Sequence, residues 1–475
     1  MGDDARRNVI LTAAIAGLGG LLFGYDTGII ASALLFIRTD LSLDSFEQGV
    51  VVAAVPIGAA FGALAAGPMA DKYGRRIIII VSAFVFIAGA LGSAASDSFA
   101  VLTISRVVIG VAIGFASAVA PVYISEMAPP DIRGRLVTMF QLAVTIGILV
   151  AYFVGLAFES SGDWRWMLGL GAVPALLLAG GMIKMPQSPR WLVMSGQDYK
   201  ARATLQQIRS GGEHEIDVEI AEIESQVGQE PGHWSELRTP MMRAALTVGV
   251  GLAILQQVTG INTVIYYAPT IVEYTGINSS SSAILASIAV GIVNVGMTVV
   301  AIRLLDRAGR RPLLLYGVAG MSLSLFTLGL AFQIGDQTTI TSVIAIGSLM
   351  LFVASFAISL GPIFWLLNSE IYPLRTRSKA AGLGTFANWI FNFIVSLTFL
   401  LLIDALGQSG AFWLYAGVGV FTFFFCLKLV PETKGKRLEE IEAEFNRRAG
   451  VTGSGPDEPA GGPGPEPAAP APAAP

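Results

Sequence analysis

The sequence has little charge, a single cysteine and two histidines. Only 13% of its 475 residues are charged and 53% are hydrophobic, about half the charged share of a soluble domain, so a cytosolic enzyme is excluded. The lone Cys426 excludes an internal disulfide, a cysteine-held iron–sulfur cluster and a zinc site with two thiolates. The net charge of −4 comes without a basic block outside the loops. We therefore expect no metal, no other cofactor and no nucleic acid partner.

Long apolar runs dominate the chain up to about residue 430. Each is about twenty residues long, enough to cross the roughly 30 Å apolar layer of a bilayer. The first follows a segment too short and too acidic for a secretory leader and shows no cleavage site, so it predicts a transmembrane helix ending near Ile37. The fold class is thus an all-α polytopic membrane protein of twelve spans, the later ones near 47–69, 77–95, 99–124, 136–157, 166–184, 243–270, 282–304, 312–333, 340–367, 380–404 and 409–430.

The sequence also repeats itself. DKYGRR at 71–76 recurs as DRAGRR at 306–311, the Ser-Glu pair at 125–126 recurs at 369–370, and the motif at Pro186 has a weaker echo at Pro431. The members of each pair follow spans two and eight, four and ten, or six and twelve. The chain is therefore predicted to be two parallel six-helix halves, an arrangement in which transporters bind substrate between the halves and rock them to alternate access.

Lysine and arginine gather in the loops after spans two, four, eight and ten, while the opposite loops carry little beyond Arg38 and Arg165. By the positive-inside rule, both termini and the central loop are cytoplasmic. The expected domains are the first half (1–184), a cytoplasmic loop of short helices (185–242), the second half (243–430), a cytoplasmic C-terminal helix (431–450) and a disordered tail rich in Pro, Gly and Ala (451–475).

Asp26 lies in the middle of the first span. An ionised carboxylate there costs several kcal/mol unless it faces a cavity or a cation. Arg106, in span four, is the candidate partner: close by, it should keep Asp26 ionised, and its withdrawal should favour protonation. Asp26 and Arg106 thus predict a proton-coupling pair. The alternatives are a fixed structural ion pair and an Arg106 that reaches toward the interface.

Span seven carries amides and phenols at Gln256, Gln257, Asn262 and Tyr266, with Gly260 as a weak point and Pro269 as a break. Together they indicate a polar, uncharged ligand rich in hydroxyls, and the alternative is hydrogen bonding between helices. Trp365 offers an aromatic face for a sugar ring. Other spans add further polar side chains: Gln141, Asn294, Asn388, Trp389 and Asn392.

Charged loop residues lie together at the cytoplasmic side. We expect them to form ion pairs that close the two halves there and part when that side opens, the alternative being a topology signal alone. The expected gate comprises Asp71, Arg75, Glu126 and Arg133 of the first half and Asp306, Arg310, Glu370 and Arg377 of the second.

Seven stretches resemble the sugar porter family of the major facilitator superfamily. The resemblance runs in order over about residues 10–445 and implies the family fold, with a small cytoplasmic helical domain, and a membrane carrier rather than an enzyme. The stretches are GLLFGYD (20–26), DKYGRR (71–76), PVYISE (121–126), PQSPRWL (186–192), QQVTGINTVIYYAP (256–269), DRAGRR (306–311) and PETKG (431–435).

The resemblance also implies residue roles. Asp26 matches a carboxylate of bacterial proton-coupled members similar to the xylose symporter, and Gln187 stands where the family usually has Glu, which leaves one cytoplasmic ion pair in doubt. The implied sugar contacts are Gln141, Gln256, Gln257, Asn262, Asn294, Trp365 and Asn388, and the implied aromatic or gating residues are Phe23, Tyr266, Tyr267 and Trp389.

These features predict a proton-driven importer of glucose, xylose or a related sugar or polyol. Its expected partners are the monosaccharide, protons and the lipid bilayer of a bacterial cytoplasmic membrane, with the monomer as the functional unit. Two alternatives remain: a facilitative uniporter in which Asp26 is structural, and a sugar sensor that does not transport.

Overall fold

The computed structural model describes residues 3–209, 212–227, 233–277, 279–334, 339–373, 375–436 and 438–449. Within these ranges the secondary structure is helical throughout. The first half contains α1 (Asp3–Asp40), α2 (Ser45–Tyr73), α3 (Arg75–Ala94), α4 (Phe99–Met127), α5 (Arg133–Ala157), α6 (Trp164–Gly169) and α7 (Ala172–Lys184). Short helices follow: α8 (Pro189–Met194), α9 (Asp198–Ile208), α10 (Glu213–Val227) and the 3-10 helix η1 (Trp234–Arg238).

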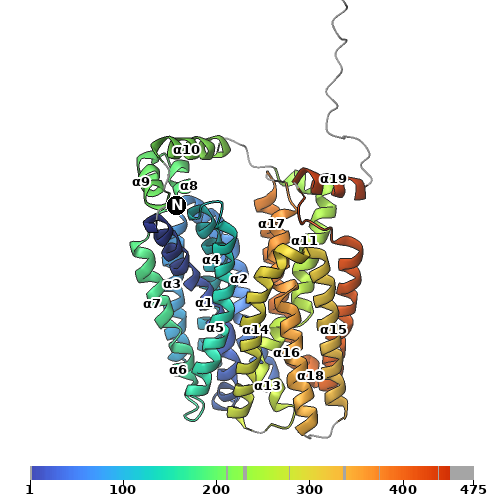
Figure 1. Cartoon of the computed structure of the whole chain (residues 1–475). Coiled ribbons are helices and arrows are strands. Elements are labelled where there is room, and N and C mark those ends of the chain that lie inside the picture. Colours follow the sequence, from blue (N-terminus) through green and yellow to red (C-terminus); the bar gives the residue numbers. More distant parts are fainter. Residues whose placement is uncertain are drawn as a thin grey trace, which may run out of the picture.

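The second half contains the remaining helices. They are α11 (Pro240–Val258), α12 (Ile261–Tyr266), α13 (Ala268–Glu273), α14 (Ser280–Ala308), α15 (Arg310–Ile334), α16 (Thr339–Ala357), α17 (Leu360–Glu370) and α18 (Arg377–Leu429), followed by α19 (Leu438–Arg448). The long helices run side by side, with the N-terminus, α8–α10 and α19 at one end of the bundle (Figure 1). We call this end the terminal face and the opposite end the far face. The predicted tail at 451–475 lies outside the described residues.

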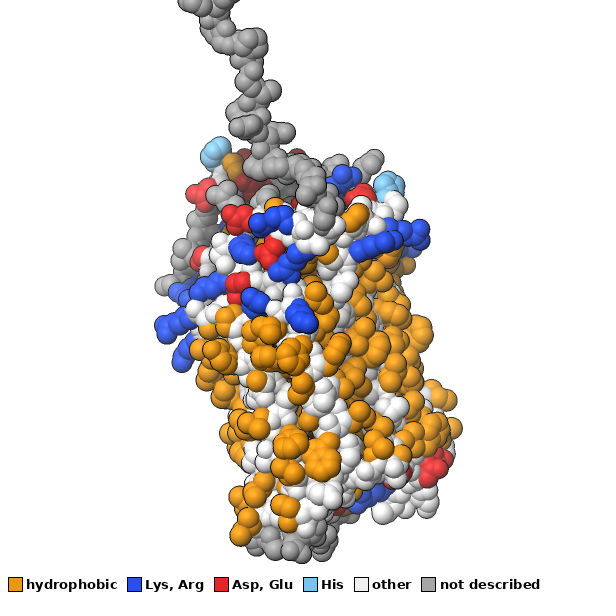
Figure 2. All heavy atoms as spheres, turned by 90° about the vertical axis from the view of Figure 1, so that its right-hand side faces the viewer, with side chains coloured by type: hydrophobic (Ala, Val, Ile, Leu, Met, Phe, Trp, Pro, Cys, Tyr) orange, Lys and Arg blue, Asp and Glu red, His pale blue; other side chains and the backbone are white. Residues whose placement is uncertain are grey.

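Eleven helical stretches of the described chain are long and apolar enough to cross a membrane. The last of them, α18, has 53 residues and is interrupted at Gly407, whose φ of 71° and ψ of 169° are not helical. It therefore holds two spans joined at the far face, and the architecture is the predicted one of twelve spans. Seen from the right-hand side of Figure 1, the middle of the bundle is covered by hydrophobic side chains, and most charged side chains gather toward the terminal face (Figure 2).

Three spans are broken. Span seven is interrupted at Gly260, whose φ of 89° suits only glycine well, so the predicted weak point is confirmed. The second break falls at Tyr267, and Pro269 lies in the first turn of α13 rather than at the break itself. Span six is split between α6 and α7, and span ten between α16 and α17. The sequence did not predict these two breaks.

Neighbouring spans within a half approach closely through small residues. A Cβ atom at Gly110 of α4 would lie 2.9 Å from the Cα atom of Gly58 of α2. At Gly24 of α1 it would lie 2.7 Å from the carbonyl carbon of Val144 of α5. Because lipid gives no hydrophobic drive for helix association, such close packing holds membrane helices together.

The internal repeat is visible at the terminal face as two matching sets of hydrogen bonds from a backbone to a side chain, which we call brackets. In the first half, the backbone N–H of Arg76 donates to Oε1 of Gln187 at 3.0 Å. In the second, the N–H groups of Arg310 and Arg311 donate to the Glu432 carboxylate at 3.0 and 3.1 Å. Each bracket ties the loop after a half's last span to the first turn of its third span, α3 or α15.

Glu432 is charged where Gln187 is neutral. Partial burial alone would raise the pKa of Glu432, but backbone N–H donors from Lys434, Arg310 and Arg311 and the charge of Arg310 hold that pKa below its usual range. The neutral Gln187 keeps the acceptor oxygen without the charge.

Contacts between the two halves gather toward the far face. A Cβ atom at Gly49, one turn from the far end of α2, would lie 2.6 Å from the carbonyl oxygen of Leu397 of α18. The Tyr152 hydroxyl of α5 donates to the carbonyl oxygen of Ile265 at 3.0 Å, and Arg38 of α1 pairs with Glu273 of α13 at 2.9 Å. The conformation is therefore closed on the far face.

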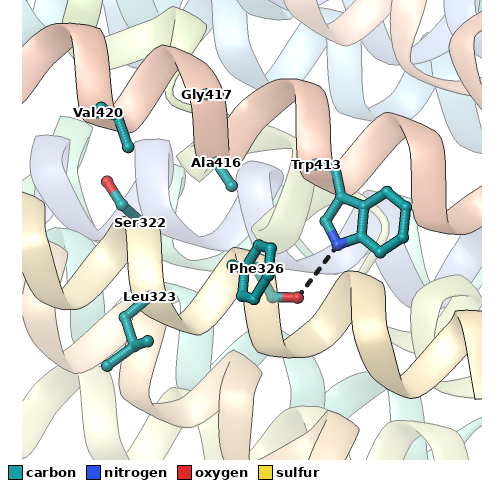
Figure 3. Close-up of a pocket in the computed structure, with 7 residues that line it drawn as sticks. All are labelled: Ser322, Leu323, Phe326, Trp413, Ala416, Gly417 and Val420. Atoms are coloured by element: carbon teal, nitrogen blue, oxygen red, sulfur yellow. Dashed lines mark hydrogen bonds between the residues drawn. The ribbon is translucent and has the colours of Figure 1, made fainter.

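A groove of about 650 Å³ lies on the outer surface of the second half, between α15 and the end of α18. Its walls include Leu323 and Phe326 on one side and Trp413 and Val420 on the other (Figure 3). The Trp413 indole N–H donates to the carbonyl oxygen of Phe326 at 3.3 Å. The groove contains none of the predicted site residues.

Candidate functional site

Asp26 and Arg106 form a buried ion pair inside the first half. Their side chains are 4% and 1% exposed, and Nη1 and Nη2 of Arg106 donate to the two carboxylate oxygens at 3.2 and 3.3 Å. The Arg106 Nε donates to the carbonyl oxygen of Val51 at 2.8 Å, so α2 holds the guanidinium in position. The predicted partnership is present. The arrangement leaves each charge satisfied in a place where an unpaired one would be costly.

The predicted amides of span seven form one hydrogen-bond network with Asn388. The Asn388 Nδ2 donates to Oε1 of Gln256 at 2.7 Å, and the Gln257 Nε2 donates to Oδ1 of Asn388 at 3.1 Å. Asn262 Nδ2 donates to Oε1 of Gln257 at 2.6 Å, across the break at Gly260. The non-helical turn there brings Asn262 back toward Gln257. Gln256, Gln257 and Asn388 are buried.

The hydroxyl of Tyr266 and the amide of Asn392 continue this polar layer. Asn392 Nδ2 donates to the Tyr266 hydroxyl at 3.4 Å, and Ser396 donates to Oδ1 of Asn392 at 3.1 Å. The Tyr267 hydroxyl contacts α18 one turn further on, donating to the carbonyl oxygen of Ser396 at 3.0 Å. Helix α12, which carries Tyr266, packs against α1, which carries Asp26, so the polar layer of the second half lies beside the helix of the proton-coupling candidate.

The aromatic candidates lie where the halves meet. The rings of Phe23 and Trp389 have centroids 5.4 Å apart, which places α1 and α18 in contact. The Trp389 indole N–H is buried and has no hydrogen-bond acceptor among the described residues. It is a free donor beside the amide network. Trp365 stands apart, with its ring against Phe364 and 39% of the residue exposed.

Two predicted sugar contacts stay outside the network. Asn294 of α14 is buried and Gln141 of α5 is half-buried, and no side-chain hydrogen bond of either is found among the described residues. The structure thus gathers Gln256, Gln257, Asn262 and Asn388 and leaves Gln141 and Asn294 as separate polar groups. Sequence reasoning missed Tyr152, whose hydroxyl binds the Ile265 carbonyl of span seven. A phenol within an otherwise apolar span was the available signal.

The loop charges pair within each half. Arg75 contacts Asp71 at 3.0 Å and Glu126 at 3.2 Å, and Arg310 contacts Glu370 at 3.2 Å. They were expected to close one half onto the other, which they do not do in this conformation. Their role as a gate stays a prediction for a conformation closed at the terminal face.

The remaining gate candidates make backbone contacts. Arg133 donates to the carbonyl oxygen of Ala128 at 3.5 Å, and Arg377 to that of Tyr372 at 3.1 Å. The side chain of Asp306 lies outside the described residues. Glu126 accepts a hydrogen bond from the Ser188 hydroxyl, and Glu370 accepts one from the Thr433 hydroxyl. These two contacts occupy equivalent positions in the two halves, as the brackets do.

Comparisons with known proteins agree with this geometry. The family model described as "Sugar (and other) transporter" matches residues 12–445. A D-xylose transporter of Levilactobacillus brevis is 43% identical, covering 91% of this chain and 95% of the relative. The galactose-proton symporter of Escherichia coli (strain K12) is 41% identical, covering 90% and 92%. The inward-open structure of the Escherichia coli xylose transporter XylE superposes with a TM-score of 0.80 at 32% identity, covering 92% and 99%. This chain, a membrane transporter and not an enzyme, therefore belongs to the sugar porter family of the major facilitator superfamily.

Proposed function

We propose that the protein imports a monosaccharide, glucose, xylose or a related sugar or polyol, together with a proton. The observation that carries the proposal is the buried Asp26–Arg106 pair, which lies on helices of the first half and whose helix α1 packs against α12 of the polar layer. An acid in this place can exchange a proton as the halves move. Relatives described as a D-xylose transporter and a galactose-proton symporter support both the cargo and the coupling.

The amide network supplies the sugar-binding chemistry. Amide groups donate and accept hydrogen bonds at once, as sugar hydroxyls require. A bound sugar would exchange contacts with Gln257, Asn262 and Asn388, and the unpaired Trp389 N–H offers a donor with no competing partner. Trp365 and Asn294 would add an aromatic face and a further amide.

The proposed cycle places the terminal face in the cytoplasm of a bacterial cell, in agreement with the loop arginines. In this conformation the far face is closed and Asp26 is paired with Arg106, as expected once the proton has left toward the cytoplasm. Opening to the outside would separate the far-face contacts and let Asp26 take up a proton with the sugar. We propose that one monomer completes this cycle.

The electrical energy is sufficient for accumulation. One charge moved through about 100 mV supplies about 2.3 kcal/mol. At one proton per sugar this supports roughly fifty-fold accumulation, since about 1.4 kcal/mol corresponds to a factor of ten.

Proton flux tests the proposal directly. The protein is reconstituted into vesicles with a pH indicator in the external solution and no imposed pH gradient. Adding sugar outside should raise the external pH, because each imported sugar carries a proton inward. A panel of unlabelled pentoses, hexoses and polyols competing for uptake would name the cargo. Sugar movement with no pH change would favour the uniporter, and sugar binding without movement would favour a sensor.

A further inference from the structure

The groove on the outer surface of the second half lies between two helices that touch beneath it. Its most deeply placed lining residues are small: Ser322 of α15 and Ala416 of α18 are buried. A Cβ atom at Gly419 of α18 would lie 2.3 Å from Oγ of Ser322, so the helices are in direct contact there. A Cβ atom at Gly417 would meet nothing within 4 Å, so the groove is open above this residue.

Larger side chains form the two edges of the groove. Leu323 and Phe326 of α15 are exposed on one edge, and Val420 of α18 is exposed on the other. The ring of Trp413 stacks on that of Phe326, with centroids 6.3 Å apart (Figure 3). From Trp413 to Val420 the groove follows α18 for about 10 Å, at a rise of about 1.5 Å per residue.

The groove lies at the middle depth of the membrane. Along α18, Trp413 lies about 9 Å from Gly407 at the far face, and Val420 lies about 14 Å from the end of the helix at Leu429. The apolar layer of a bilayer is roughly 30 Å thick. The groove therefore lies inside this layer and away from both headgroup regions, at a depth that acyl chains occupy.

The two polar side chains of the groove are already bonded within the protein. The Trp413 N–H donates to the carbonyl oxygen of Phe326 at 3.3 Å, and the Ser322 hydroxyl donates to that of Val318 at 2.9 Å. None of the seven lining residues is charged, and the sequence has no charged residue from 312 to 334 or from 407 to 427. A sugar would leave hydroxyl groups unpaired here, whereas a hydrocarbon has none to pair.

We propose that the groove binds one acyl chain of a membrane phospholipid. It is continuous with the hydrophobic surface of the spans, since the exposed Leu330, Phe421 and Phe424 extend the apolar surface around it (Figure 2). An empty groove would forfeit the dispersion contacts of its walls, and a chain lying along it gains them on three sides. A helix of a second copy, about 10–12 Å across, is too wide to lie between two helices that touch.

Quenching of Trp413 fluorescence by brominated lipid tests the proposal. The protein is placed in vesicles of dioleoylphosphatidylcholine, in which a varied fraction of the molecules carries bromine at the middle of the chains and quenches an indole on contact. The signal of Trp413 is the difference between the protein and its Trp413→Phe variant. If one bound chain covers the ring, the loss of signal is proportional to the brominated fraction, because that chain is brominated with that probability.

Filling the groove provides a second measurement. Gly417→Leu places a side chain in the open space and should reduce the quenching of Trp413 about twofold at each brominated fraction, because the leucine takes the place of chain atoms against the walls. Each protein is compared with its own Trp413→Phe partner. The matched control is Gly296→Leu: Gly296 is exposed on α14, outside the groove, and also has nothing within 4 Å of the new Cβ. It should leave the quenching unchanged.

Three outcomes would overturn the proposal. The first is an initial loss of signal steeper than proportional, which means that several chains reach the ring. The second is equal quenching in Gly417→Leu and the unmodified protein. The third is a loss of quenching as the ratio of protein to lipid rises, which would indicate a second copy in the groove. The fluorescence is read without sugar or a proton gradient, so it stands apart from the vesicle assay of proton flux.

Discussion

Replacing Asp26 by Asn separates coupling from binding. The amide keeps the shape of the carboxylate but cannot carry a proton, so accumulation driven by about 100 mV should fall from roughly fifty-fold to none. Exchange of labelled for unlabelled sugar should continue, because the amide network lies on the other half. The measurement is uptake by vesicles with an imposed potential, with and without an uncoupler.

The same substitution has a cost in stability that follows from the geometry. Arg106 is 1% exposed; the substituted amide offers its oxygen to only one of the two Nη groups, and the guanidinium loses the opposite charge while keeping its bond to the Val51 carbonyl. Removing one partner of a buried pair destabilises a protein by about 3–5 kcal/mol. The double variant Asp26→Asn, Arg106→Gln leaves no unpaired charge and should recover most of that loss in thermal unfolding.

Asp40→Asn is the matched control. Asp40 belongs to the same helix but lies at its far end, where it accepts from Arg165 at 2.9 Å. Its replacement should leave accumulation intact. Full accumulation by the Asp26→Asn protein would refute the coupling role, and a double variant no more stable than the single one would refute the energetic reasoning.

Three further predictions concern packing, binding and pH. Gly110→Ala should lower stability by about 1–3 kcal/mol in thermal unfolding because the added methyl group meets the facing helix, whereas Gly17→Ala, with nothing within 4 Å of the new Cβ, should not. Asn388→Ala leaves buried amides unpaired and should raise the KM for sugar uptake about tenfold. The control is Asn8→Ala, an exposed amide near the start of α1 that bonds the Gln207 carbonyl, and its KM should not change. Equal KM values for the two variants would place the sugar elsewhere. The pKa of Glu432 is held below its usual range, so its ionised form stabilises the folded protein. This stabilisation is fully present at a pH above the ordinary Glu pKa of about 4.3 and is lost as the pH falls through the lowered pKa. Glu432→Gln should flatten that part of the profile of unfolding temperature against pH, and an unchanged slope would contradict the assignment.

The features that the sequence predicted are those in which a residue would be unfavourable in its local setting without a particular partner or backbone conformation. A carboxylate in mid-membrane needs a cation, which pointed from Asp26 to Arg106. A glycine within a group of amides, after Gln256 and Gln257 and before Asn262, marked the break at Gly260. The span count followed from run length, although Gly407 joins the last two spans without a loop long enough to separate the helices.

The features that escaped prediction depend on distant partners. Arg38 and Glu273 lie 235 residues apart in the sequence, in different halves, and neither has a local pattern that identifies the other as its partner. The loop arginines were assigned across the halves because charge alone does not say which carboxylate is nearest. In the structure, Arg75 finds Glu126 of its own half at 3.2 Å. The break in span ten before Leu360 is different, because Gly361 and Pro362 follow it directly and are a local signal that the sequence analysis did not use.

The two brackets at the terminal face show that equivalent positions of the two halves keep the same hydrogen-bond geometry while differing in charge. Gln187 accepts from the start of α3 and Glu432 from the matching start of α15, yet one is neutral and the other anionic. The architecture thus depends on acceptor geometry at these positions, while the electrical character of each copy can drift. The two halves are thus electrostatically unequal at equivalent positions of the terminal face, although the local backbone arrangement is the same in both.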